Sequence, residues 1–247
     1  MVLKLIACKV LQRELCSLLY RCPNMVDVTM IRQDYHSSAP ALRRCLQEEI
    51  DRIESGGDVH TNDLKYGDLD AILLGYGLCS NSLVGLHSSR YPLVVPRAHD
   101  CITLVLGSKE RYREYFDAHG DSYYYSQGWL DLGFNLGKDV LDRKRAEYRE
   151  KYDDEETVEF LMEAEEEMLK NYRRITYIEW DGIPDNGRRK IAEDIAAERR
   201  FEFVRVPGDS SLLERMLLGV WEEKEFLVVP PGKSIAPSYD DGVIKAI

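Results

Sequence analysis

Residues 2–22, VLKLIACKVLQRELCSLLYRC, decide the fold. The first seven, VLKLIAC, form an apolar run of strand length. The residues that follow repeat apolar side chains at helical spacing, with one face carrying Leu11, Leu15, Leu18 and Leu19. A strand followed directly by an amphipathic helix begins a β–α unit, and repeated units of this kind build a parallel sheet.

The same alternation continues to about residue 100. Residues 26–32 (VDVTMIR) are β-branched and short, as in a strand. Residues 40–57 (PALRRCLQEEIDRIESGG) begin with proline and end with the two glycines typical of a helix stop. Residues 70–77 (DAILLGYG) and 91–97 (YPLVVPR) predict two further strands. We therefore expect an α/β fold with a mainly parallel sheet and flanking helices.

The second half repeats this pattern after one or two long charged helices between residues 139 and 172. Strands and helices are then expected to alternate over residues 174–180, 188–200, 201–206, 210–223 and 226–230. Glycines punctuate residues 128–137, as is typical of a boundary. The pattern predicts two Rossmann-like α/β lobes, residues 1–130 and 131–247.

Composition excludes several classes of protein. The 247 residues contain 33 basic and 44 acidic side chains, and a net charge of −11 disfavours binding to nucleic acid. Apolar runs fall far short of the roughly 20 residues that cross a bilayer. The N-terminal apolar stretch lacks a signal-peptide cleavage site, so we expect a cytoplasmic protein without a membrane partner. Six cysteines are then reduced thiols or metal ligands rather than disulfides.

Residues 153–168, DDEETVEFLMEAEEEM, carry nine acids in sixteen positions. They predict a solvated helix with one packed face, and the alternative is a docking surface for a basic partner. The packed stripe is expected to contain Val158, Leu161, Met162, Met168, Leu169 and Tyr172.

Cysteine and histidine follow each of the first four predicted strands. Cys8 ends the first strand, His36 follows the second, Cys79 the third, and His99 and Cys101 the fourth. Parallel sheets bind ligands beyond the carboxyl ends of their strands, and thiolates and imidazoles are good zinc ligands. The sequence therefore predicts a metal site of Cys8, Cys79 and Cys101, with His99 as a fourth ligand or a neighbouring base. His36 is expected close by.

Residues 97–101 also predict local structure around that site. Asp100 is a natural N-cap for a helix that begins at Cys101. The helix N-terminus is expected to lower the pKa of the Cys101 thiol, and Arg97 adds positive charge nearby. Gly75, Gly77 and Gly85 frame Cys79 and permit tight turns or a close backbone approach to a ligand.

Other candidate residues carry a weaker signal. Residues 123–130, YYYSQGWL, concentrate aromatic side chains. Tyr125 and Trp129 are expected to pack in a core, with a wall for a flat ligand as the alternative. The remaining cysteines, Cys16, Cys22 and Cys45, lie in predicted helices and are expected to pack as small apolar residues.

Four segments carry a resemblance to a known family. GYGLCSNSLVGL (75–86), PRAHDCITLVLGS (96–108), YYYSQGWL and IACKVLQREL (6–15) resemble domain-of-unknown-function family 1638 over at least residues 4–130. On this resemblance, the positions characteristic of the family are Cys8, Cys79, His99, Asp100 and Cys101. Members of this family occur in anaerobes beside corrinoid-dependent methyltransferases, so the resemblance implies a role in one-carbon metabolism.

Three functions agree with these patterns. The first is a metal-binding protein that holds zinc, or an iron–sulfur cluster, and assists or performs corrinoid-dependent methyl transfer. Its corrinoid would come through a partner, either a methyltransferase or a corrinoid protein. The second is a cofactor-independent, racemase-like isomerase that uses Cys thiols, although Cys8 and Cys79 both lie in the first lobe. The third is a non-catalytic partner-binding module with a structural metal.

Overall fold

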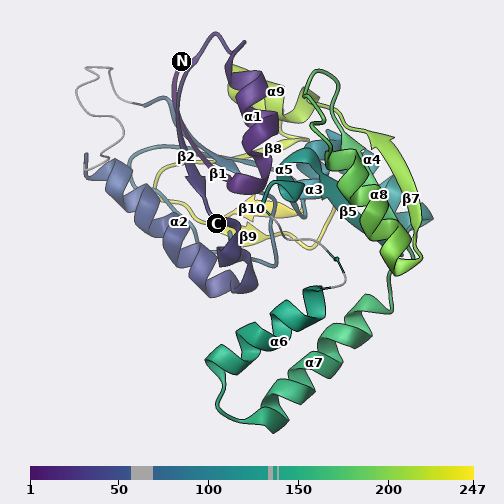
Figure 1. The fold of residues 1–247 in the computed structure, drawn as a ribbon. Helices are drawn as coiled ribbons and strands as arrows, with labels where there is room; N and C mark the ends of the chain where they lie inside the picture. Colours follow the sequence, from purple (N-terminus) through teal and green to yellow (C-terminus); the bar gives the residue numbers. More distant parts are fainter. Residues whose placement is uncertain (57–68, 133–135, 138) are drawn as a thin grey trace. The chain divides into compact units, whose positions relative to one another are not determined.

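The chain folds into two compact units (Figure 1). The computed structural model describes residues 1–56, 69–132, 136–137 and 139–247. Unit 1 comprises Met1–Arg113 together with Gly208–Ile247, and unit 2 comprises Glu114–Pro207. Unit 2 is thus inserted in the sequence between two parts of unit 1. Within the described residues, no helix combines the length and apolarity needed to cross a membrane.

A five-stranded sheet in the order β2-β1-β3-β4-β8 forms the centre of unit 1. The first four strands are parallel, as predicted, and β8 pairs antiparallel with β4. Almost every residue of β1, β3 and β4 is buried, which matches their continuous apolar sequences. The strands are β1 (Val2–Cys8), β2 (Met25–Ile31), β3 (Ala71–Gly75), β4 (Leu93–Pro96) and β8 (Phe226–Val229).

The chain adds its second and third strands on opposite sides of β1, so the sheet has a topological switch point between β1 and β3. From β1 the chain passes through η1 (Lys9–Leu11) and α1 (Gln12–Leu19) to β2 on one side. It then returns through η2 (Gln33–Ser37) and α2 (Ala39–Glu54) to β3 on the other side of β1. Such a switch point opens a crevice at the carboxyl ends of the two central strands, where open α/β sheets bind ligands.

Helix α2 shows why this sequence folds as predicted. The Ser38 hydroxyl accepts a hydrogen bond from the Ala41 amide and caps the helix, and Pro40 lies in its first turn. Its apolar stripe is buried, and consists of Leu42, Leu46, Ile50 and Ile53. Unit 1 also contains the helices α3 (Cys101–Leu106) and α9 (Ser211–Leu218). Two short strands, β9 (Ile235–Pro237) and β10 (Ile244–Ala246), pair antiparallel. Helix α4 (Lys109–Ala118) spans the boundary between the two units.

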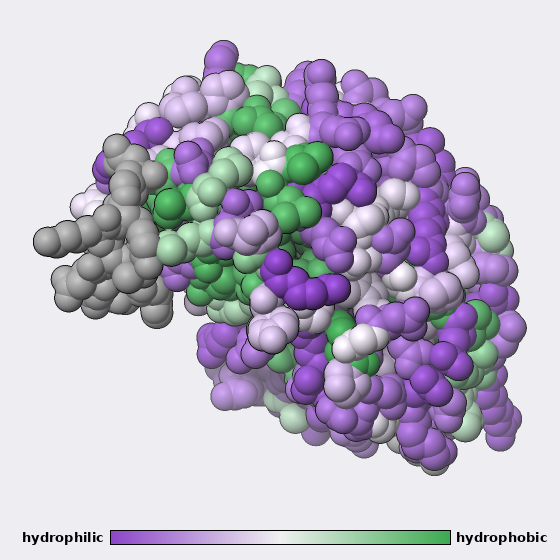
Figure 2. All heavy atoms as spheres, turned by 90° about the horizontal axis from the view of Figure 1, so that it is seen from above, coloured by the Kyte–Doolittle hydropathy of each residue, from purple (hydrophilic) through white to green (hydrophobic). Residues whose placement is uncertain are grey.

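Apolar side chains are exposed near the amino-terminal edge of this sheet. Met1 is 48% exposed and Met25 is 42% exposed, and both precede or begin a strand. Leu218, the last residue of α9, and Val220, which follows it, have similar exposure. Figure 2, which is seen from above the view of Figure 1, shows apolar surface gathered in one part of that face, with hydrophilic surface around it.

Unit 2 contains a three-stranded parallel sheet in the order β5-β6-β7. Its elements are β5 (Ser122–Ser126), α5 (Gln127–Leu130), α6 (Val140–Lys151), α7 (Glu155–Leu169), β6 (Arg174–Glu179), α8 (Arg188–Arg199) and β7 (Glu202–Pro207). Buried residues between the sheet and α8 form its core, which includes Tyr125, Leu136, Ile175, Tyr177 and Ile195. The strands follow one another without a reversal, so two Rossmann-like lobes are not confirmed.

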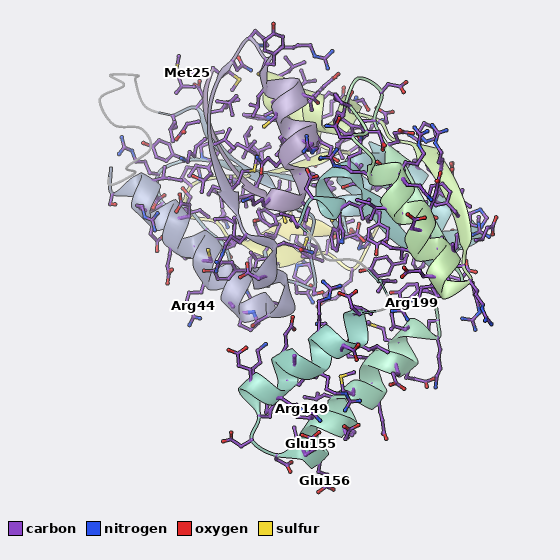
Figure 3. The ribbon with its side chains drawn as sticks, in the orientation of Figure 1. Met25, Arg44, Arg149, Glu155, Glu156 and Arg199 are labelled. Atoms are coloured by element: carbon purple, nitrogen blue, oxygen red, sulfur yellow. The ribbon has the colours of Figure 1, made fainter. Side chains whose placement is uncertain are left out.

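The acidic helix α7 packs against the basic helix α6. Arg145 pairs with Glu159, Arg149 pairs with Glu155 (Figure 3), and the Tyr148 hydroxyl donates to Glu165 at 2.5 Å. The packed stripe is confirmed at Val158 and Met162, which are buried, whereas Met168 is 45% exposed. The prediction for Met168 was wrong because, at about 100° per residue, it lies about 80° around the helix from Val158, at the edge of the stripe, whereas Leu169 in the same turn packs against the core.

The observed units differ from the expected division at residue 130. Helix α9 and strand β8 were expected in the second lobe, but both belong to unit 1. The physical reason is the edge of β4, which would leave a row of backbone hydrogen-bonding groups without partners. Strand β8 pairs with that edge from Leu93 opposite Val229 to Pro96 opposite Phe226.

Candidate functional site

Three thiols lie at the carboxyl edge of the unit 1 sheet, as the strand-end pattern predicts. Cys8 is the last residue of β1, Cys79 lies in the loop after β3, and Cys101 begins α3 after β4. All three are free cysteines, and Cys8 and Cys101 are buried while Cys79 is half-buried. This edge includes the switch point between β1 and β3.

The loops that follow β3 and β4 are joined by backbone hydrogen bonds. The Leu78 amide donates to the Ala98 carbonyl at 2.8 Å, and the Cys79 amide donates to the His99 carbonyl at 2.9 Å. Gly77 makes this pairing sterically feasible, since a Cβ atom there would lie 2.5 Å from the Asp100 nitrogen. Gly77 therefore permits two loops to pack closely, while the predicted backbone approach to a ligand stays a prediction.

Cys79 starts a left-handed turn of three consecutive residues. The φ angles are 45° at Cys79, 55° at Ser80 and 64° at Asn81. Left-handed backbone costs roughly 1–2 kcal/mol for each residue that carries a Cβ atom, so surrounding contacts must hold it. The Ser82 hydroxyl donates to the Cys79 carbonyl at 2.6 Å, and Arg43 Nη2 donates to the Asn81 carbonyl at 2.7 Å.

The three thiols are electrostatically coupled. Burial raises the pKa of Cys8 to about 11. Burial, and then the charges of Asp100 and Cys8, raise the pKa of Cys79 to about 12. The pKa of Cys101 is raised well above its usual range by burial, then by Asp100, Cys79 and Cys8. Each ionised thiol thus disfavours ionisation of another, which is the repulsion that a bound cation relieves.

Asp100 is the N-cap of α3, as predicted. Its Oδ1 accepts hydrogen bonds from the amides of Ile102 at 3.1 Å and Thr103 at 3.2 Å, and its Oδ2 accepts from the Tyr112 hydroxyl at 3.1 Å. The prediction that the helix N-terminus lowers the pKa of Cys101 was wrong. Burial of the thiol and the adjacent Asp100 carboxylate outweigh the favourable backbone contribution.

The predicted fourth ligand lies at the surface. The His99 side chain is exposed, with its ring centroid 6.5 Å from that of Tyr112. His36 belongs to η2, and its side chain lies outside the described residues. Across the part of the chain that the structure describes, no group of three or more Cys, His, Asp or Glu is placed to hold a metal ion.

Arg97 binds backbone carbonyls of the C-terminal segment. Its Nε donates to the Glu223 carbonyl at 2.7 Å, and its Nη1 donates to the carbonyls of Gly242, at 2.8 Å, and Ile244. These bonds anchor the segment that carries β10 beside the end of β4. The structure thus places the Arg97 guanidinium in a structural role.

The aromatic candidates lie in unit 2. Tyr125 is fully buried in the hydrophobic core, and its hydroxyl accepts a hydrogen bond from the Leu136 amide at 2.7 Å. Trp129 packs against the same core. Both positions match the packing role that the sequence favoured over a wall for a ligand.

The match to a family model covers residues 30–217, and the model is described as "Protein of unknown function (DUF1638)". The chain belongs to this family. No curated protein and no solved structure matches it. In this DUF1638 protein, Cys79 and Cys101 lie inside the matched region and Cys8 precedes it.

One residue at this edge of the DUF1638 protein, Tyr76, was not predicted from the sequence. It follows Gly75, the last residue of β3, which lies opposite Ala7. Burial raises the pKa of Tyr76 well above its usual range, and the charges of Cys8, Cys79 and Cys45 raise it further. Its place directly after a buried strand is a signal that could have identified it. Cys45 is half-buried in α2, and its packing role stays a prediction.

Proposed function

We propose that this DUF1638 protein binds a soft metal through Cys8, Cys79 and Cys101, as a zinc ion or an iron–sulfur cluster. The observation that carries the proposal is the placement of three free thiols after three neighbouring parallel strands, β1, β3 and β4, at one edge of the sheet. Thiolate is the ligand that such metals prefer, and binding releases the thiol protons that burial otherwise retains. Unit 1 then serves as a Rossmann-like ligand-binding lobe.

The two metals require different spacing between the sulfur atoms. A single zinc with Zn–S bonds of about 2.3 Å holds its sulfurs about 3.8 Å apart. The described residues contain no group placed in this way, so zinc requires the cysteine side chains to move toward one another. An iron–sulfur cluster distributes its cysteines over several irons and accommodates wider spacing. The two forms are distinguished by the metal that accompanies the purified protein.

The residues around the thiols would support such a site. Asp100 fixes the first turn of α3 and with it the Cys101 backbone, and the Cys79 turn is held by Arg43 and Ser82. Zinc held by Cys8, Cys79 and Cys101 would supply Lewis-acid chemistry at an open coordination position. We place this chemistry in the cytoplasm, in or beside corrinoid-dependent methyl transfer, with a methyltransferase or corrinoid protein as partner.

Anaerobic purification followed by elemental analysis and an optical spectrum tests the proposal. We expect stoichiometric zinc, or iron with sulfide and broad visible absorption, and loss of the metal in Cys79→Ser and Cys101→Ser. Cys16→Ser is the matched control, because Cys16 is exposed on α1 and takes no part in the site. Substoichiometric metal that does not change in Cys79→Ser would refute metal binding at these thiols.

A further inference from the structure

Helix α7 carries a second apolar ridge on the side opposite its buried stripe. The ridge consists of Phe160, Ala164 and Met168, which follow one another at intervals of four residues and are all exposed. Phe160 is 69% exposed, the largest exposed fraction of any phenylalanine in the described part of the chain. At about 100° per residue, it lies about 160° around the helix from the buried Val158 and Met162. The packing that buries those two residues therefore leaves the ridge uncovered.

A ridge of this kind is suited to packing against another helix. Residues four apart form the ridges that interdigitate in helix pairs, and the small side chain of Ala164 at the centre lets a second backbone approach closely. Solvated helix faces carry charged or polar residues at such positions. Phe160 and Met168, one turn on either side of Ala164, instead resemble the anchors by which amphipathic helices bind their partners. The occupant that fits the ridge is a helix with an apolar stripe of its own.

The carboxylates beside the ridge determine the charge of that helix. Glu156, Glu163 and Glu167 are exposed and lie within about 60° of Phe160, all on the same side of the ridge. Glu167 pairs with the exposed Lys170 at 2.8 Å. Glu156 and Glu163 make no ion pair with any residue that the structure describes. The ridge therefore has an acidic border whose charge is largely uncompensated.

The acidic side chains that face α6 already have basic partners. Glu155 pairs with Arg149, and Glu159 pairs with Arg145. The border of the ridge would instead repel the same face of a second copy, and likewise nucleic acid or an anionic membrane. A protein helix whose lysines or arginines flank an apolar stripe matches both the ridge and its charge.

We propose that the outer face of α7 docks a basic amphipathic helix of a partner protein. Phe160, Ala164 and Met168 contact the apolar stripe of that helix, and Glu156 and Glu163 pair with its lysines or arginines. This inference concerns unit 2 alone and does not depend on whether the thiols of unit 1 bind a metal.

The test titrates the full chain with a synthetic peptide of the same length as α7, in which leucines form one helical stripe and lysines flank it. The Met168 methyl signal is observed by ¹H–¹³C NMR and is assigned from its absence in Met168→Leu. We expect this signal to shift when the peptide is added, together with the amide signals of the outer face of α7. A peptide of the same composition in scrambled order, with equal charge and no stripe, should leave it in place at the same concentration.

Matched variants separate the ridge from the overall charge of the chain. Phe160→Ala should weaken binding of the peptide at least about tenfold, whereas Phe116→Ala, at an exposed position on α4, should leave it unchanged. Glu163→Lys should also weaken binding. Its control is Glu150→Lys, because Glu150 is exposed on α6 and undergoes the same change of charge. Thermal unfolding without peptide checks that each variant is folded.

The same measurements can contradict the proposal. An unmoved Met168 signal, or equal binding of the scrambled peptide, would mean that the ridge does not select an amphipathic helix. Equal weakening by Glu163→Lys and Glu150→Lys would attribute binding to net charge alone. A Met168 signal that moves when the protein is diluted without peptide would show that a second copy of the chain covers the ridge, and would overturn a separate partner.

Discussion

Single residues at the thiol edge are constrained mainly by backbone contacts. Gly77 lies against the Asp100 backbone, and the next residues pair with the loop after β4 before the chain enters the left-handed turn. A local change at Gly77 therefore affects two loops that carry two of the three thiols. The constraint acts on the fold and on the site together.

Gly77→Ala should destabilise the protein by about 1–3 kcal/mol, because the new methyl group meets backbone atoms that cannot rotate away. The midpoint of urea unfolding measures the change. Gly120→Ala is the control, since the nearest atom to its Cβ lies at an ordinary 3.5 Å. Equal midpoints for the two variants would mean that the loops separate at little cost.

The raised pKa of Cys8 makes stability depend on pH. Burial raises that pKa from 9.0 to about 11, so between these values the unfolded chain has lost a proton that the folded chain retains. The free energy of unfolding therefore falls as pH rises through this window, and this one thiol contributes at most about 3 kcal/mol. Below pH 9 the contribution is fully present.

Chemical unfolding of the metal-free, reduced protein from pH 8 to 11 measures this dependence. Cys8→Ala should flatten the decline relative to the unchanged protein, because it removes the group that titrates differently in the two states. Cys16→Ala, at an exposed position, should leave the slope as it is. A Cys8→Ala profile parallel to that of the unchanged protein would contradict the raised pKa of Cys8.

At the scale of elements, the α6–α7 hairpin depends on charge pairing and capping. The Asp154 carboxylate caps α7 by accepting from the amides of Glu156 at 3.3 Å and Thr157 at 3.0 Å. Asp154→Ala removes the acceptor, whereas Asp154→Asn keeps one. We expect hydrogen exchange in the first turn of α7 to accelerate several-fold in the alanine variant only. Unchanged exchange would show that the pairs with α6 suffice to hold that turn.

Local sequence patterns predict elements well and their partners poorly. Apolar spacing predicted α2 and the first four strands, and Asp100 predicted the start of α3. The pattern of residues 226–230 predicted a strand but could not reveal its antiparallel pairing with β4, which depends on an edge more than a hundred residues away in the sequence. The strand ends predicted the positions of Cys8, Cys79 and Cys101 at one edge of the sheet, and their role in a site stays a prediction. His99 is exposed, because Asp100 caps α3 and the chain turns there into the helix.

At the scale of the whole molecule, the insertion of unit 2 into unit 1 determines which fragments can fold. The buried core cluster of unit 2 runs from Tyr125 to Ala196, within the continuous segment Glu114–Pro207. Unit 1 instead needs the chain on both sides of the insertion, because β8 covers the edge of β4 and the Asp209 amide donates to the Val105 carbonyl at 3.1 Å. The two units should therefore respond differently to isolation.

A fragment of residues 109–207, which keeps α4 whole, should unfold cooperatively and give dispersed NMR signals.

A fragment of residues 1–113 should aggregate, because the β4 edge and the apolar surface under α9 are exposed. Joining residues 1–113 to 208–247 through a short Gly/Ser linker should restore a soluble monomer, since Asp209 already lies beside Val105. Size-exclusion chromatography and thermal unfolding distinguish these outcomes. A soluble, cooperatively folded 1–113 fragment would mean that β8 is an accessory strand, and that the thiol edge is organised by the first four strands alone.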